Sequence, residues 1–148
     1  KKAYLCTYIN QKNNEGSLGK RLYTRVSDVY DGTNRPCITR EAGIRPVILA
    51  MSKGRLGAVA IVDEEERLEG IITDGDLRRM MEKYDDVDGV TAKDVMSKSP
   101  KTISEDELAY NAYRMMEQNS ITQLVVVDND RHYKGMVHIH DILREGVV

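Results

Sequence analysis

Apolar runs occur in two pairs along the chain. Positions 58–63 (AVAIVD) and 123–128 (QLVVVD) are rich in β-branched residues, and each run is followed, after a polar turn, by a second apolar run at 68–73 (LEGIIT) or 133–138 (YKGMVH). Short runs of this length, bounded by turn residues, are typical of buried strands. Each pair therefore predicts a β-hairpin, and the acidic run 63–66 is expected at the turn of the first one.

The two hairpins belong to an internal repeat. Residues 38–79 align with 103–144 at a constant offset of 65, and SDVYDG (27–32) resembles KDVMSK (93–98) at an offset of 66. Identical pairs at the first offset include Asp63 and Asp128, Gly70 and Gly135, Asp76 and Asp141, and Arg79 and Arg144. A repeat of this length predicts two copies of one structural unit.

Each hairpin is expected to have a short strand and a helix before it and a second helix after it. In the second copy, apolar residues recur at helical spacing at Leu108, Ala112, Met115 and Met116. Ser104 and Glu107 match a capping box for that helix. In the first copy Pro46 disfavours a helix interior, so we expect the helix to begin near Arg45 with Pro46 in its first turn, the alternative being a kink.

The predicted unit is β-α-β-β-α, repeated twice, and the predicted fold class is α+β. A half of about 60 residues is marginally stable alone. We therefore expect the halves to pack on each other about a pseudo-twofold axis, which leaves two related clefts between them.

Composition narrows the function. The 148 residues are 41% hydrophobic and 31% charged, with a net charge of −2, so no strong attraction to nucleic acid or to an anionic membrane is expected. No apolar run reaches the length of a transmembrane helix, and the first residues do not resemble a signal peptide. Cys6 and Cys37 form no paired pattern. These features predict a cytoplasmic protein with two free thiols.

The stretch IITDGDLRR (71–79) carries the first candidate site. Thr73 and Asp76 can chelate ribose hydroxyls, while Asp74 stands beside them and Arg78 and Arg79 can neutralise a phosphate near a helix N-terminus. Thr and Asp are also ordinary N-cap residues. Both interpretations stay open, and the recurrence of the pattern as Gly135-x-x-His138-x-x-Asp141 favours a site.

The second copy offers His138, His140, Asp141 and Arg144. We expect the two histidines to alternate on a strand and to share one face, with Asp141 on the opposite face. A metal site needs a third ligand on that face, so no metal is predicted. The imidazoles are expected to line the cleft, where they can meet a phosphate or a sugar carboxylate with a charge that titrates near neutrality.

The tandem repeat closed by G-h-h-[ST]-x-x-D resembles a pair of CBS domains, which bind nucleotides and regulate an attached enzyme or channel. The segments GSLGKRL…RVSDV, GAVAIVD, GIITDGDLRR and GMVHIHDILREGVV are also similar to the C-terminal part of the bacterial arabinose-5-phosphate isomerases, which make a precursor of 3-deoxy-D-manno-octulosonate for lipopolysaccharide. The resemblance implies a linker at 1–25, CBS domains at 26–84 and 91–148, and a homo-oligomer.

By this resemblance, the backbone near Ile38 and Ile103 would meet the base of an adenine nucleotide or of CMP-linked 3-deoxy-D-manno-octulosonate. The basic cluster of Lys20, Arg21 and Arg25 would lie where the family joins its two domains, although a solvated face is the simpler expectation. The partners implied are a nucleotide or sugar nucleotide and an attached sugar-isomerase domain, and no cofactor is expected.

No catalytic residue transfers from the family. The His-Pro-Gly-Gly that precedes this region in the isomerases is replaced by Asn13-Asn14-Glu15-Gly16, and the chain has no room for the sugar-isomerase domain. We therefore expect a regulatory fragment or a divergent homologue that does not isomerise sugars alone. A ligand-free oligomerisation scaffold is the main alternative, and an enzyme in its own right has the least support.

Overall fold

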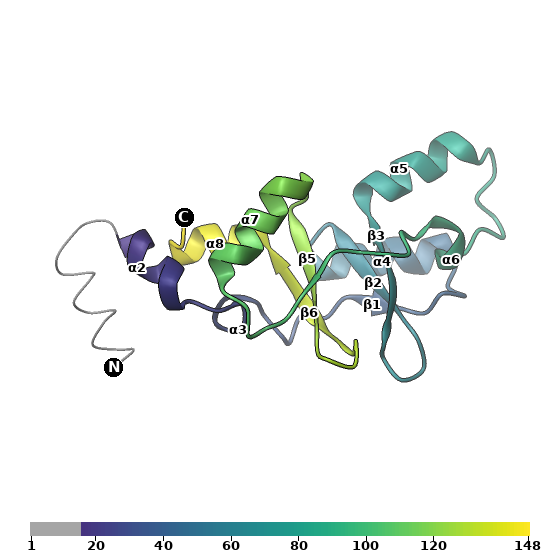
Figure 1. The fold of residues 1–148 in the computed structure, drawn as a ribbon. Helices are drawn as coiled ribbons and strands as arrows, with labels where there is room; N and C mark the ends of the chain where they lie inside the picture. Colours follow the sequence, from purple (N-terminus) through teal and green to yellow (C-terminus); the bar gives the residue numbers. More distant parts are fainter. Residues whose placement is uncertain (1–15) are drawn as a thin grey trace.

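The computed structural model describes residues 16–148 (Figure 1). The elements of the first repeat are α3 (Val26–Val29), β1 (Cys37–Ile38), α4 (Ile44–Gly54), β2 (Ala58–Val62), β3 (Leu68–Thr73) and α5 (Asp74–Lys83). Those of the second are α6 (Ala92–Val95), β4 (Thr102–Ile103), α7 (Ala109–Asn119), β5 (Gln123–Val127), β6 (Tyr133–His138) and α8 (Ile139–Glu145). The predicted β-α-β-β-α order is confirmed in both copies, each with an additional short helix at its start.

Each repeat forms its own three-stranded sheet, in the orders β1-β2-β3 and β4-β5-β6. The first two strands of each sheet are parallel and the last two antiparallel. Registers correspond across the repeat, since Ala58 pairs with Thr73 as Gln123 pairs with His138. Even the register shift recurs, after Ile61 in one hairpin and after Val126 in the other.

The two sheets share one hydrophobic layer. Residues from β2 and β3 pack against residues from β5 and β6, including the almost fully buried Tyr133 and Met136. The two hairpin turns also bond to each other, because Leu68 N–H donates to Arg131 O and Tyr133 N–H to Glu66 O, both at 2.9 Å. The expected packing of the halves is thus present, with apolar burial as its main stabilisation.

Helix α4 begins at Ile44 after the N-cap Gly43, so Pro46 lies in the first turn as predicted. The capping box predicted for Ser104 and Glu107 is wrong. Helix α7 begins only at Ala109. Ser104 instead accepts a hydrogen bond from Asp106 N–H at 3.1 Å, because its short side chain finds a backbone donor locally and stabilises a turn.

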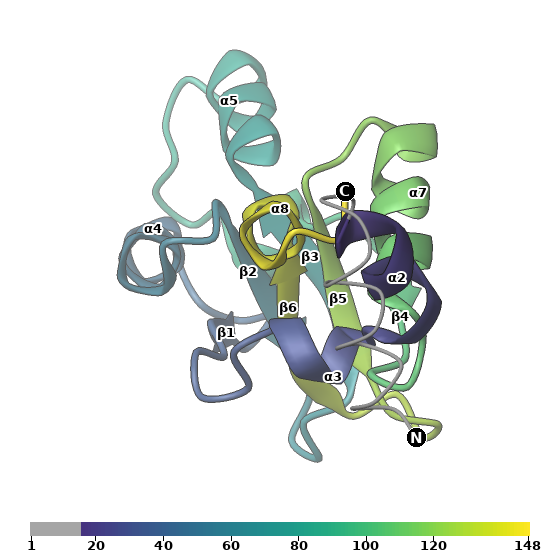
Figure 2. The same ribbon diagram turned by 90° about the vertical axis from the view of Figure 1, so that its left-hand side faces the viewer.

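Helix α2 (Gly16–Tyr23) lies beside α7 and the C-terminus (Figures 1 and 2). Lys20 Nζ donates to Glu145 O at 2.7 Å, Arg21 Nε donates to Val147 O at 3.3 Å, and the Arg21 guanidinium stacks over the Tyr110 ring. The expectation of a solvated basic face is wrong for these two residues, because the terminal carbonyls give their cations partners. Cys6 and the other residues before Gly16 lie outside the described part.

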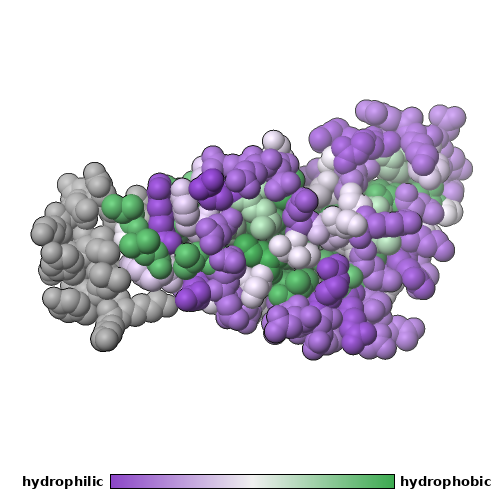
Figure 3. Space-filling model, viewed as in Figure 1, coloured by the Kyte–Doolittle hydropathy of each residue, from purple (hydrophilic) through white to green (hydrophobic). Residues whose placement is uncertain are grey.

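The molecular surface is mostly hydrophilic over α5 and the hairpin ends, and hydrophobic side chains gather around α2 (Figure 3). Leu18 and Leu22 of α2 are among the exposed large apolar residues. Within residues 16–148, every helix is too short or too polar to cross a membrane.

Candidate functional site

The candidate site of the first repeat lies at the junction of β3 and α5. Thr73 is the N-cap of α5, and its Oγ1 accepts from Asp76 N–H at 3.3 Å while Asp76 Oδ2 accepts from Thr73 N–H at 2.9 Å. This capping box satisfies two backbone donors that the helix leaves unpaired. The capping interpretation of TDGD is therefore correct for Thr73 and Asp76, whatever else they bind.

The second repeat builds the same junction with a histidine. Asp141 Oδ2 accepts from His138 N–H at 2.8 Å, and His138 Nδ1 accepts from His140 N–H at 3.1 Å. Strand β6 ends at His138 and α8 begins at Ile139. The prediction that both histidines alternate on a strand is wrong, because the capping box starts the helix between them.

The two imidazoles nevertheless lie together, stacked with their ring centroids 4.8 Å apart. Burial, followed by the neighbouring His140, lowers the pKa of His138 below its ordinary value. A neutral ring is also what the cap requires, since Nδ1 can accept a hydrogen bond only when it carries no proton.

Each motif aspartate also pairs with an arginine one turn later. Arg79 lies 2.6 Å from Asp76 Oδ1, and Arg144 lies 2.6 Å from Asp141 Oδ1. Both arginine side chains remain largely exposed, at 69% and 73%. The two ion pairs therefore fix the carboxylates, and each guanidinium keeps exposed donors for a further anion.

A cleft of about 800 Å³, called here the large cleft, lies between the repeats. Seven of the sequence-predicted site residues line it: Thr73, Asp74, Arg78, His138, His140, Asp141 and Arg144. The lining also includes Asp31, Asn34, Arg55 and Gln123, which sequence analysis did not propose. Asp31 could have been found from the sequence, because it lies in the segment 27–32 that recurs in the second repeat as 93–98.

A second cavity of about 260 Å³, called here the small cleft, lies at the pseudo-equivalent place, between the β3–α5 junction of the first repeat and residues of the second. Asp76 and Arg79 line it together with Thr73, Ser97 and Lys101. Ile38 and Ile103 line neither cleft; they lie in the short strands β1 and β4. Their contact with a base stays a prediction.

The glycine of each motif lets the other repeat approach. A Cβ on Gly70 would lie 2.7 Å from both Met96 Sδ and Ser97 O. A Cβ on Gly135 would lie 2.9 Å from the Tyr30 ring, and its φ of +151° disfavours other residues. Both glycines thus bring the segment that follows the short first helix of one repeat against the hairpin of the other.

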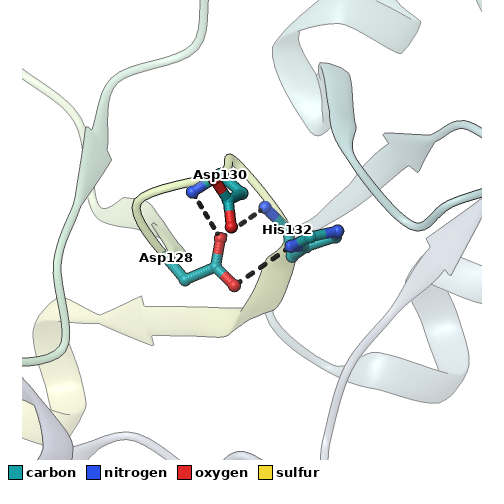
Figure 4. A group of neighbouring side chains, drawn as sticks. All are labelled: Asp128, Asp130 and His132. Atoms are coloured by element: carbon teal, nitrogen blue, oxygen red, sulfur yellow. Dashed lines mark hydrogen bonds and ion pairs between the residues drawn. The ribbon is translucent and has the colours of Figure 1, made fainter.

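Asp128, Asp130 and His132 gather at the turn between β5 and β6 (Figure 4). One ligand atom from each lies within 4.8 Å of the others, a spacing that a metal ion could use. However, Asp128 Oδ1 accepts from Asp130 N–H and His132 N–H at 2.9 Å, and Oδ2 lies 3.1 Å from His132 Nδ1. These hydrogen bonds, led by that from His132 N–H, lower the pKa of Asp128.

The first repeat builds the same turn without this set of ligands. Asp63 Oδ1 accepts from Glu65 N–H and Arg67 N–H at 2.9 Å. Arg67 stands where His132 stands in the second repeat, and a guanidinium does not ligate a metal. The cluster is thus explained by the hydrogen bonds of the hairpin turn.

Two sheets packed about a pseudo-twofold axis, with a G-h-h-x-x-x-D junction and a cleft between the repeats, define a CBS-domain pair. The CBS domain model matches residues 26–83 and 92–147, and the chain belongs to the CBS domain family. Among solved structures, the CBS domain pair of protein MJ0100, in complex with 5′-methylthioadenosine and S-adenosyl-L-methionine, is 26% identical with a TM-score of 0.73. That likeness covers 82% of this chain and 94% of the other.

The curated relatives are sugar-phosphate isomerases. Arabinose 5-phosphate isomerase KdsD of Yersinia pestis is 39% identical over 134 residues, and KpsF of Escherichia coli is 40% identical over 126 residues. These alignments cover 90% and 85% of this chain but only 40% and 38% of the relatives. The chain thus spans about two fifths of their length and corresponds to their CBS region.

Proposed function

We propose that this chain is the regulatory, nucleotide-binding CBS pair of an arabinose-5-phosphate isomerase-like protein. The observation that carries the proposal is the large cleft, where carboxylate, imidazole and guanidinium groups from both repeats converge. Its volume lies within the range of roughly 300–1,000 Å³ that is usual for small-ligand sites.

The cationic and anionic side chains of the large cleft indicate which parts of a nucleotide they would bind. Arg78 from the first repeat and Arg144 from the second supply cations for phosphate, and His140 lines the same cleft. Asp141 can accept hydrogen bonds from two ribose hydroxyls. Asp31 and Asn34 come from the segment before β1 and offer polar contacts to the base.

A related protein supports the chemical class of the ligand. The pair of MJ0100 holds two adenosine derivatives. An adenine nucleotide is therefore the first candidate here. CMP-linked 3-deoxy-D-manno-octulosonate is the second, because its carboxylate and phosphate suit the same cations, and its binding would give feedback on lipopolysaccharide synthesis.

Regulation would follow from differential affinity. A ligand shifts an attached domain only if it binds one arrangement of the repeats more tightly than another. Because the cleft is formed by both repeats, ligand contacts on both sides would favour the arrangement that brings Arg78 and Arg144 to one phosphate.

One observation favours a scaffold instead. Asp76 and Asp141 already bond to backbone and arginine within the chain. A ligand-free oligomerisation module would use both residues only as helix caps.

Thermal unfolding with a ligand panel separates these functions. We expect AMP, at about one hundred times its dissociation constant, to add about 2.7 kcal/mol and to raise the midpoint by about 5–10 °C. A shift with CMP-linked 3-deoxy-D-manno-octulosonate and none with AMP or CMP would identify a pathway sensor. Unchanged midpoints with the whole panel would contradict nucleotide binding and support the scaffold.

A further inference from the structure

The two clefts are related by the pseudo-twofold axis, but the residues that line them differ at aligned positions. The segment that approaches the small cleft places Ser97 there, and the segment that approaches the large cleft places Asp31 at the aligned position, 66 residues earlier. A serine can donate a hydrogen bond to a carboxylate, whereas an ionised aspartate cannot.

Asp76 in the small cleft has little capacity left for a ligand. Its Oδ2 accepts from Thr73 N–H at 2.9 Å and from Thr73 Oγ1 at 3.1 Å, and its Oδ1 accepts from Arg79 at 2.6 Å and from Ser97 Oγ at 3.4 Å. Only 7% of the residue is exposed. A ribose hydroxyl would have to displace partners that this carboxylate already holds.

Asp141 in the large cleft is more available. Its hydrogen bonds come from His138 N–H at 2.8 Å and from Arg144 at 2.6 Å. Its side chain is 15% exposed, about twice the value for Asp76. His138, as the N-cap, has no hydroxyl to donate in the way that Thr73 does.

Asp31 is hydrogen-bonded to Thr33 and donates no hydrogen bond to Asp141. Its Oδ1 accepts from the backbone N–H and the hydroxyl of Thr33. The hydroxyl bond, followed by the backbone bond, lowers the pKa of Asp31, so its carboxylate is ionised at neutral pH. It therefore lines the cleft as a further acceptor and does not close it.

The volumes of the two clefts agree with the different availability of Asp76 and Asp141. The small cleft, at about 260 Å³, lies below the usual range for ligand sites of roughly 300–1,000 Å³, and the large cleft, at about 800 Å³, lies within it.

We propose that each chain binds one nucleotide, in the large cleft with Asp141 on the ribose hydroxyls, and that Ser97 and the Thr73 hydroxyl keep Asp76 and the small cleft out of ligand binding. The inference rests on the proposed function and adds the stoichiometry and the residues that set it. The two motif aspartates thus have different roles, one as ribose ligand and one as a helix cap alone.

Isothermal titration of the whole chain with AMP tests the inference. We expect one equivalent per chain. Asp141→Asn should weaken binding more than about tenfold, the effect of losing a charged hydrogen-bond acceptor, while the matched variant Asp76→Asn should bind AMP as the parent chain does.

A second pair of variants does not depend on the capping residues. Asp31→Ser supplies the donor that Ser97 has and should weaken AMP binding more than Asp31→Ala, which removes the carboxylate without adding a donor. Circular dichroism of each variant is the control that it is folded.

Two equivalents of AMP, or equal weakening by Asp76→Asn and Asp141→Asn, would overturn the inference and leave nucleotide binding intact. An Asp31→Ser variant that binds as well as Asp31→Ala would also overturn the role given to the serine donor. No AMP binding by the parent chain would overturn the proposed function and this inference together.

Discussion

Thr73 and His138 occupy equivalent positions, and each is the N-cap of the last helix of its repeat. Thr73 Oγ1 accepts from Asp76 N–H, and His138 Nδ1 accepts from His140 N–H. The hydroxyl does this at any pH, but the imidazole does so only while Nδ1 is unprotonated. One repeat therefore has a cap that titrates and the other does not.

We predict that His138→Thr reduces the pH dependence of stability. Because folding lowers the pKa of His138, the unfolded chain binds the proton more readily, and the neutral ring stabilises the fold above the unfolded pKa of about 6.5. That stabilisation is lost as the pH falls below this value. Urea unfolding at pH 7.5 and 5.5 should show the parent chain losing up to about 1 kcal/mol more than the variant.

A second variant, His138→Ala, measures how much an N-cap side chain at this position contributes to stability. At pH 7.5 His138→Ala should be less stable than His138→Thr by about 1 kcal/mol, the usual value of an N-cap side chain. If the parent chain and His138→Thr lost the same stability on acidification, the titrating cap would be refuted.

Gly70→Ala should destabilise the chain by about 1–3 kcal/mol, as overpacking does in tightly packed interiors. The new Cβ would lie 2.7 Å from the Ser97 carbonyl, which is held in place by mutual backbone hydrogen bonds with Ile71. Gly32→Ala is the control, since its nearest neighbour would lie 3.7 Å away, and it should stay within about 0.5 kcal/mol of the parent. Equal stabilities in chemical denaturation would argue against the close approach.

Tyr133→Phe should cost about 1 kcal/mol, the net value of one hydrogen bond. The buried Tyr133 hydroxyl donates to Pro36 O at 3.0 Å, and this oxygen keeps a second partner in Ala60 N–H. Tyr113→Phe removes a surface hydroxyl bonded to Glu117 and should leave the midpoint of urea unfolding unchanged. A Tyr133→Phe chain as stable as the parent would show that the bond contributes nothing.

AMP should bind more tightly than adenosine, and Arg78→Ala should reduce that difference by about tenfold or more, the value of a charge-assisted hydrogen bond. Lys53→Ala, on an exposed position of α4 outside the large cleft, should preserve it. Titration calorimetry measures both ratios. An unchanged ratio in Arg78→Ala would place the phosphate elsewhere.

The hairpins and the repeat were predictable because burial on both faces requires continuous β-branched runs, and these are local in sequence. The Thr73–Asp76 junction was predictable for the same reason, since a capping box is a local pattern. Applying that pattern at the offset of 65 residues would also have placed His140 in a helix.

The other parts of the site depend on contacts between distant segments. Asp31 and Asn34 line the large cleft only because their segment packs against the hairpin of the other repeat, near Gly135. The difference between Asp31 and Ser97 can be interpreted only when the positions of Asp76 and Asp141 are known. Similarly, Lys20 and Arg21 look like a solvated cluster until α2 is seen against the C-terminus.

The central claim is that a nucleotide occupies the large cleft, and the imidazole proton signals test it most directly. The chain has three histidines: His138 and His140 line the cleft, and His132 lies in a hairpin turn outside it. Titration with AMP, followed by proton NMR, should shift the signals of His138 and His140 and leave that of His132 in place. Unmoved His138 and His140 signals at saturating AMP would contradict the account.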